Sequence, residues 1–233
     1  MALIIALILF FTSISPTHAQ SLQDLSHLQD QYKTDCSLQL TKQQIDKQYN
    51  TISSNREYID STKICLITRN KMIGTYLAIL ENNLNKYKPI NPDQTANLQS
   101  TLHQTAISLQ DQNQNIANFQ TKDEIKNYAT DFQKKYETIQ KDIAKGIAQS
   151  ESNRYGQIKN ELYLIAATNP KILSDLSSRF DNTTMYFQKI DADIQDQDNR
   201  NATGISADVK YNLDNIKNEI INIRNTIVFY YAN

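Results

Sequence analysis

The feature that most constrains the fold of this 233-residue chain is an apolar repeat that alternates steps of four and three residues. The repeat is clearest in residues 208–231 (DVKYNLDNIKNEIINIRNTIVFYY), where it runs through Val209, Leu213, Ile216, Ile220, Ile223, Ile227 and Tyr230. Side chains with this spacing lie on one face of an α-helix. An apolar face of this length has to pack against a partner surface, which belongs either to this chain or to another molecule.

The same spacing recurs in residues 73–87, 98–119, 132–143 and 173–194. A sustained seven-residue apolar repeat is typical of helices that pack at a shallow angle, as in coiled coils and antiparallel bundles. No alternating strand pattern of comparable length competes with it. The repeat therefore predicts that most of the chain is helical.

Start signals for helices divide the chain. Asn91-Pro92 and Asn169-Pro170 each place an N-cap residue before a proline at the first helical position. Thr121 with Glu124, and Ser54 with Glu57, match the capping-box pattern. We expect helices near residues 22–49, 55–87, 92–118, 122–167, 170–197 and 206–231.

The expected helix at residues 122–167 has an alternative interpretation. Gly146 and Gly156, with Ser150 and Ser152 between them, favour a break that would divide it in two.

Composition agrees with long helices. Apolar residues make up 39% of the chain, and glycine and proline number only four each, so few positions favour a turn. We expect an all-α protein, with residues 20–233 folded as an elongated antiparallel up-and-down helical bundle with coiled-coil-like seams, because linkers of about 3–9 residues make successive helices antiparallel. The alternative is that one apolar stripe, above all the C-terminal one, pairs with a second chain. The protein is accordingly expected to be a monomer or a homodimer.

The first 19 residues have the pattern of a secretory signal peptide. An unbroken apolar run from Leu3 to Phe11 precedes Thr17-His18-Ala19, after which we expect cleavage. The run is shorter than the roughly 20 residues needed to cross a bilayer. Since no Lys or Arg precedes the run, an uncleaved N-terminal anchor helix is the alternative. The expected location of the mature protein is secreted or periplasmic.

The chain has two cysteines, Cys36 and Cys65, and export would favour their oxidation to a disulfide. The midpoint between them falls at Asn50 and Thr51, beside the turn-like stretch NTISSNRE, so a hairpin there would bring the two cysteines together. The alternative is one unbroken helix across the turn, which would place the sulfurs about 40 Å apart. We favour the hairpin.

Residue patterns for catalysis are missing from the sequence. After cleavage only His27 and His103 remain, neither in a metal-binding spacing, and no nucleophile elbow, phosphate-binding loop or dinucleotide-binding loop occurs. We therefore expect no catalytic residues, no cofactor and no metal site, and hence no enzyme. The net charge of −1 also gives no broad field for nucleic acid, which we do not expect as a partner.

Two clusters are candidates for protein contacts. The first is the C-terminal aromatic run Phe229, Tyr230 and Tyr231, of which the bundle can bury only one face; the alternative is that the run simply closes the end of the core. The second is the acidic group Asp191, Asp193, Asp196 and Asp198, as a docking patch or a weak Ca²⁺ site. The acidic group lacks the EF-hand spacing, and its alternative is a solvated helix end.

These observations predict an exported, non-enzymatic helical-bundle protein that acts by binding an unidentified protein partner. A first alternative is a membrane-active protein that inserts residues 72–80 (MIGTYLAIL), although their spacing favours a buried helix and no membrane contact. A second alternative is a bundle that binds a small ligand between its helices. Asn182 and Asn201 match the N-glycosylation pattern, which matters only in a eukaryotic source.

Overall fold

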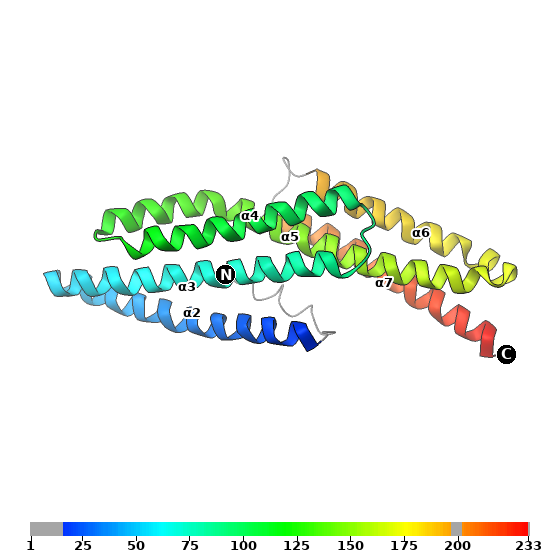
Figure 1. Cartoon of the computed structure of the whole chain (residues 1–233), viewed down its shortest axis with the longest axis horizontal. Helices are drawn as coiled ribbons and strands as arrows, with labels where there is room; N and C mark the ends of the chain where they lie inside the picture. The colour runs from blue at the N-terminus through cyan, green and yellow to red at the C-terminus, as the bar shows by residue number, and fades with distance from the viewer. Residues whose placement is uncertain (1–15, 197–201, 233) are drawn as a thin grey trace. The chain divides into compact units, whose positions relative to one another are not determined.

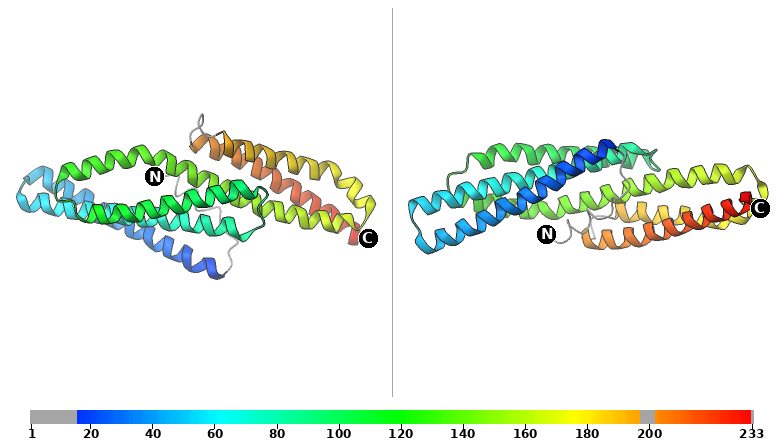
Figure 2. Two further views of the ribbon diagram at one scale, coloured as in Figure 1. Left: turned by 45° about the horizontal axis from the view of Figure 1, so that its top comes forward. Right: turned by 90° about the horizontal axis from the view of Figure 1, so that it is seen from below.

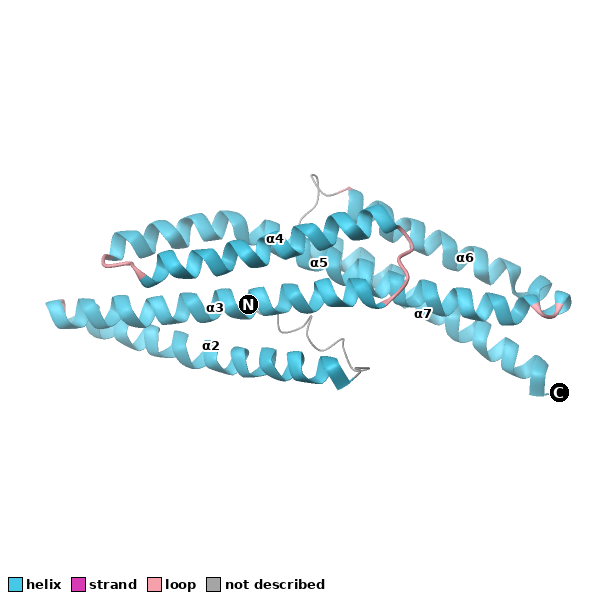
Figure 3. Cartoon of the chain, viewed as in Figure 1, coloured by secondary structure: helices cyan, strands magenta, loops and turns pink. Residues whose placement is uncertain are grey.

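The structure is a computed structural model that describes residues 16–196 and 202–232. Within these residues the chain consists of helices joined by short loops, with no strand (Figure 3). The predicted all-α fold is confirmed. Residues 1–15 of the expected signal peptide, and Asp198 and Asn201, lie outside the described residues. The helices are α2 (Pro16–Tyr49), α3 (Ile52–Lys86), α4 (Pro92–Ala117), α5 (Lys122–Ala167), α6 (Pro170–Gln195) and α7 (Ala202–Ala232) (Figure 1).

The chain divides into two compact units. Unit 1 comprises the residues up to Ile79 together with residues 106–127. It therefore contains α2, most of α3, the last part of α4 and the first turn of α5. Unit 2 comprises residues 80–105 and 128–233, which include the rest of α3, α4 and α5 together with α6 and α7.

Unit 1 is built on the α2–α3 hairpin. Asn50 turns the chain with a positive φ of 45°, in the left-handed region that asparagine tolerates better than most residues. The hydroxyl of Thr51 then accepts a hydrogen bond from the Ser54 N–H (3.1 Å), and Ser54 Oγ accepts one from the Thr51 N–H (2.9 Å). Contacts between the arms, such as Lys42 Nζ donating to Glu57 Oε2 at 2.7 Å, show that α2 and α3 run antiparallel.

The predicted cap at the start of α3 was wrong. Ser54 was expected to cap the helix and Glu57 to close the capping box. The helix instead begins at Ile52, because Thr51 follows the turn directly and takes the capping role. Glu57 lies a turn further into the helix, where Lys42 lowers the pKa of its carboxyl by hydrogen bonding and charge.

The other predicted caps are confirmed. The Gln94 N–H donates to Asn91 Oδ1 at 3.2 Å at the start of α4, and the Lys171 N–H donates to Asn169 Oδ1 at 3.1 Å at the start of α6. At the start of α5 the Glu124 N–H donates to Thr121 Oγ1 at 3.2 Å, while Glu124 Oε2 accepts the Thr121 N–H at 2.8 Å. Local hydrogen bonding therefore sets these three helix starts.

Unit 2 contains the surface against which the apolar stripe of residues 208–231 packs. Within unit 2, α6 and α7 lie side by side along the C-terminal part of α5 (Figure 2). Arg179 contacts Glu219 and Asp193 contacts Asn212, so residues further along α6 meet earlier residues of α7, and the two helices are antiparallel. Most of the α7 stripe is buried against α5 and α6, namely Val209, Ile216, Ile220, Ile223 and Ile227. The stripe is thus covered within this chain.

The expected single helix over residues 122–167 is confirmed, and the alternative of a break is wrong, since α5 continues through Gly146 and Gly156 from Lys122 to Ala167. The glycines serve close packing instead. A Cβ on Gly146 would lie 3.2 Å from Leu80 Cδ1 and 3.3 Å from Leu102 Cδ1, and a Cβ on Gly156 would lie 2.7 Å from the side chain of Ile90. Because these glycines have no side chain, the end of α3, the α3–α4 loop and α4 approach the α5 backbone closely.

Candidate functional site

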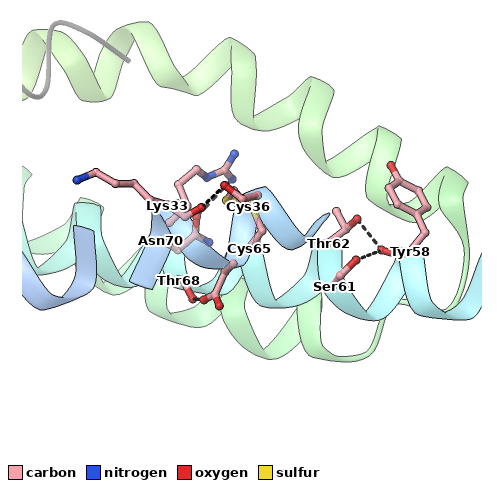
Figure 4. Close-up of a disulfide and its surroundings, with 11 residues drawn as sticks. Lys33, Cys36, Tyr58, Ser61, Thr62, Cys65, Thr68 and Asn70 are labelled. Atoms are coloured by element: carbon pink, nitrogen blue, oxygen red, sulfur yellow. Dashed lines mark hydrogen bonds between the residues drawn. A yellow bond between two sulfur atoms is a disulfide. The ribbon is translucent and has the colours of Figure 1, made fainter. Parts of the chain in front are cut away.

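The Cys36–Cys65 disulfide joins α2 to α3, as the hairpin interpretation predicted (Figure 4). The two Cα atoms are 4.9 Å apart, and the alternative of one unbroken helix is wrong. Beside the disulfide, Thr68 Oγ1 donates to Asp35 Oδ2 at 2.6 Å and makes a second link between the helices. A disulfide of this kind fits a protein of an oxidising compartment.

The three residues of the C-terminal aromatic run differ in their exposure to solvent. Phe229 and Tyr231 are 66% and 58% exposed, whereas Tyr230 packs against the apolar cluster that contains Ile227. The Tyr230 hydroxyl donates a hydrogen bond to Asp175 on α6, and this bond raises the pKa of the tyrosine. Tyr230 therefore closes the core, and its two neighbours face solvent.

The end of α5 adds further exposed apolar residues. Tyr163, Leu164 and Ile165 are consecutive and all exposed, and Leu164 reaches 69%. The hydroxyls of Thr168 and Tyr231 lie 2.6 Å apart, which brings the end of α5 to the end of α7. We call the exposed apolar residues of these two helix ends the aromatic end surface; they are Tyr163, Leu164, Ile165, Val228, Phe229 and Tyr231.

Sequence reasoning found only the α7 half of this surface. The signal for the α5 half is the apolar run LYLIAA at residues 162–167. Six consecutive apolar residues surround the helix, so one packed face cannot bury all of them. Leu162 and Ala166 pack inward, and Tyr163 lies edge-on to Phe180 with ring centroids 5.3 Å apart. Leu164 and Ile165 are left on the outside.

The acidic group does not form one site among its described members. Asp191 is half-buried, and burial raises the pKa of its carboxyl. Asp193 accepts a hydrogen bond from Asn212 Nδ2 at 3.3 Å, and Asp196 ends α6 as its C-cap residue. Across the described residues, no group of three or more His, Cys, Asp or Glu side chains is placed to hold a metal ion.

The remaining candidates from the sequence have ordinary surroundings. His103 Nδ1 lies 3.3 Å from Glu81 Oε2 on the surface, and His27 is exposed. Residues 72–80 are mostly buried, as their spacing predicted, through Met72, Ile73, Tyr76, Leu77, Ile79 and Leu80. None of the described helices is long and apolar enough to cross a membrane.

A polar pocket in unit 2 was not anticipated from the sequence. It has a volume of about 740 Å³ and lies among the first turns of α4, the middle of α5 and the end of α6. Leu98 and Ile194 form apolar parts of its wall, while Asp142 and Lys145 are an ion pair with Nζ and Oδ1 3.5 Å apart. Burial raises the pKa of the Asp142 carboxyl, and Lys145 opposes this effect.

The sequence does contain a signal for a buried polar face on α5, of which Asp142 and Lys145 line this pocket. Asp142, Lys145, Gln149 and Asn153 follow one another at steps of three, four and four residues, which is the spacing of a buried seam. All four are buried. The predicted seams consist mainly of apolar residues, so this polar face was not predicted.

The chain matches no protein-family model, no curated protein and no solved structure. Functional inference therefore starts from its own residues.

Proposed function

We propose that this protein is exported and acts without catalysis, by binding another protein through the aromatic end surface. The observation that carries the proposal is the exposure of Leu164, Phe229 and Tyr231 at adjoining helix ends. Single exposed apolar residues are common on protein surfaces, whereas here six of them occur at the ends of two helices that touch. Aromatic residues are also enriched in protein interfaces relative to other surface.

The rigidity of the neighbouring contacts supports the proposal. Tyr230 is held by the core cluster and by its hydrogen bond to Asp175, and Tyr231 is held by Thr168. The aromatic rings are thus positioned before a partner arrives, which reduces the ordering cost of binding. Export is supported by the signal-peptide pattern and by the disulfide, which fits an oxidising compartment.

The membrane-active alternative requires a larger change. Residues 72–80 would have to leave the positions in which Leu77 and Leu80 are fully buried. Binding through the aromatic end surface needs no such rearrangement. A dye-leakage measurement on liposomes with the oxidised protein would favour the alternative if dye were released.

Site-specific photocrosslinking tests the proposal. A benzophenone amino acid is placed at Phe229 and, in a matched variant, at Tyr211. Both positions are aromatic, both are on α7, and both are 66% exposed, but only Phe229 belongs to the aromatic end surface. We expect one discrete protein adduct from position 229 in the native extracytosolic environment and none from position 211.

Two further variants make the result specific to this surface. Leu164→Ser removes an apolar contact on the α5 side and should lower the adduct yield from position 229 about tenfold or more, a loss in the range of an interface hot spot. Met185→Ser, at an exposed residue of α6 outside the surface, should leave the yield unchanged. Equal adducts at 229 and 211, or no effect of Leu164→Ser, would contradict the proposal. Sedimentation of the purified protein shows whether the partner is a second copy.

A further inference from the structure

The polar pocket of unit 2 has features of a binding site that the aromatic end surface does not explain. Its volume of about 740 Å³ lies within the usual range for small-molecule sites. Residues of α4, α5 and α6 line it, so three helices hold its shape. Asn97, Thr101 and Thr138 contribute neutral polar side chains to the lining, and Asp93 contributes an exposed carboxylate.

Two of the charged lining residues are buried, and they carry opposite charges. The side chains of Asp142 and Lys145 are only 8% and 11% exposed, and they pair with each other at 3.5 Å. Burying two charges costs free energy that their mutual attraction offsets only in part. A ligand that supplies both a cation and an anion would give each residue an additional charged partner.

Unpartnered polar atoms accompany this ion pair. Both side-chain polar atoms of Gln94, which lines the pocket, are buried and have no hydrogen-bond partner among the described residues. On α5, Gln149 and Asn153 lie outside the pocket lining but continue the helix face that carries Asp142 and Lys145, and both are fully buried. Gln149 Oε1 and Asn153 Nδ2 also have no partner within the described part of the chain. Stability alone would favour apolar residues at these seam positions, because a buried polar atom without a hydrogen bond is unfavourable.

We propose that this pocket binds a small zwitterion of the α-amino acid type. The ligand ammonium would donate to Asp142 and its carboxylate would accept from Lys145. These two ligand groups sit on one carbon, which suits two protein charges that lie side by side. Gln94 would complete the polar contacts, and Leu98 with Ile194 would contact an aliphatic side chain.

The wall chemistry argues against two other ligand classes. A sugar usually stacks on an aromatic ring, and the lining residues within the described part of the chain include none. A ligand with a single charge would attract only one member of the buried Asp142–Lys145 pair and repel the other. The zwitterion is the class that matches both charges.

Binding is tested on the mature, oxidised protein. Each of the twenty common L-α-amino acids is screened by thermal shift, and the strongest is measured by isothermal titration calorimetry. Its amine-only and carboxylate-only analogues are titrated beside it. We expect each analogue to bind at least tenfold more weakly, because each loses one charge-assisted contact. The proposal is overturned if no amino acid shifts the unfolding temperature, or if the analogues bind as tightly.

Variants locate the site. Asp142→Asn and Lys145→Gln keep the side-chain size and should each weaken binding by about 10- to 100-fold. Asp131→Asn is the matched control, because Asp131 pairs with Lys134 three residues later on the same helix, but on the exposed surface. It should leave affinity unchanged. Equal loss in all three variants would overturn the site, and the analogue titrations, which use the unaltered protein, decide the case if either pocket variant fails to fold.

Discussion

Removal of the Cys36–Cys65 disulfide should destabilise unit 1 and leave unit 2 nearly unchanged. The bond closes a loop with a sequence separation of 29 residues. In the chain-entropy treatment, a loop of that length lowers the entropy of the unfolded chain enough to contribute about 3.5 kcal/mol to stability. The Cα–Cα distance of 4.9 Å lies within the usual range for disulfides, so the folded hairpin accommodates the bond without moving its backbone.

Hydrogen exchange measured peptide by peptide is the suitable assay, because it reports the stability of each of the two units separately. The wild-type oxidised protein is compared with the double variant Cys36→Ser, Cys65→Ser. Amides in the paired regions of α2 and α3 should exchange a few hundredfold faster, which corresponds to about 3.5 kcal/mol. Amides in the middle of α7 serve as the control and should keep their rates.

A second double variant, with alanine at both positions, separates loop entropy from side-chain packing. Both cysteines are half-buried, so the serine and alanine pairs should agree to within about 0.5 kcal/mol if the loop is the main cause. A loss below about 1 kcal/mol in α2 and α3, or an equal loss in α7, would refute the reasoning.

Three further predictions concern stability. Gly74→Ala should stabilise the protein by about 0.5–1 kcal/mol, because alanine favours the helix and the nearest atom to its new Cβ is 3.9 Å away. Gly146→Ala should give no such gain, because its Cβ would crowd the side chains of Leu80 and Leu102. Thermal unfolding of the two variants compares their stabilities. Tyr76→Phe should raise the free energy of unfolding by about 1 kcal/mol in urea denaturation, because the buried Tyr76 hydroxyl has no hydrogen-bond partner among the described residues. The same burial raises the pKa of this hydroxyl. A lower free energy of unfolding in the variant would show that the hydroxyl does form a hydrogen bond. The N–H of Gln120 and the groups of Thr121 lower the pKa of Glu124, so its contribution is present above its ordinary value of 4.5 and is lost as the pH falls below it. Glu124→Gln should therefore be less stable than wild type at neutral pH, and the difference should shrink as acid protonates Glu124. A difference that stays constant as the pH falls from neutral into the acid range would contradict this explanation.

Much of the fold follows from local and periodic information. The steps of four and three residues identify the buried faces, and the Asn-Pro and Thr-Glu caps place the starts of α4, α5 and α6. The disulfide was also predictable, because the Asn50 turn lies midway between the only two cysteines. In each case the cause lies within a few residues or in a repeat that one helix imposes on its own side chains.

Other features depended on contacts between distant residues, which only the tertiary structure decides. Gly146 favours a break when α5 is considered alone, but the approach of Leu80 and Leu102 makes it a packing position in an unbroken helix. The three C-terminal aromatic residues are alike in sequence, and the positions of Asp175 and Ile227 make Tyr230 the one that packs against the core. The polar pocket arises where α4 and the end of α6 meet Asp142 and Lys145. The sequence by itself determined which residues form helices and which face of each is apolar, because those properties arise within one helix. Whether a given side chain is covered, exposed or part of a pocket was decided by its neighbours from other helices.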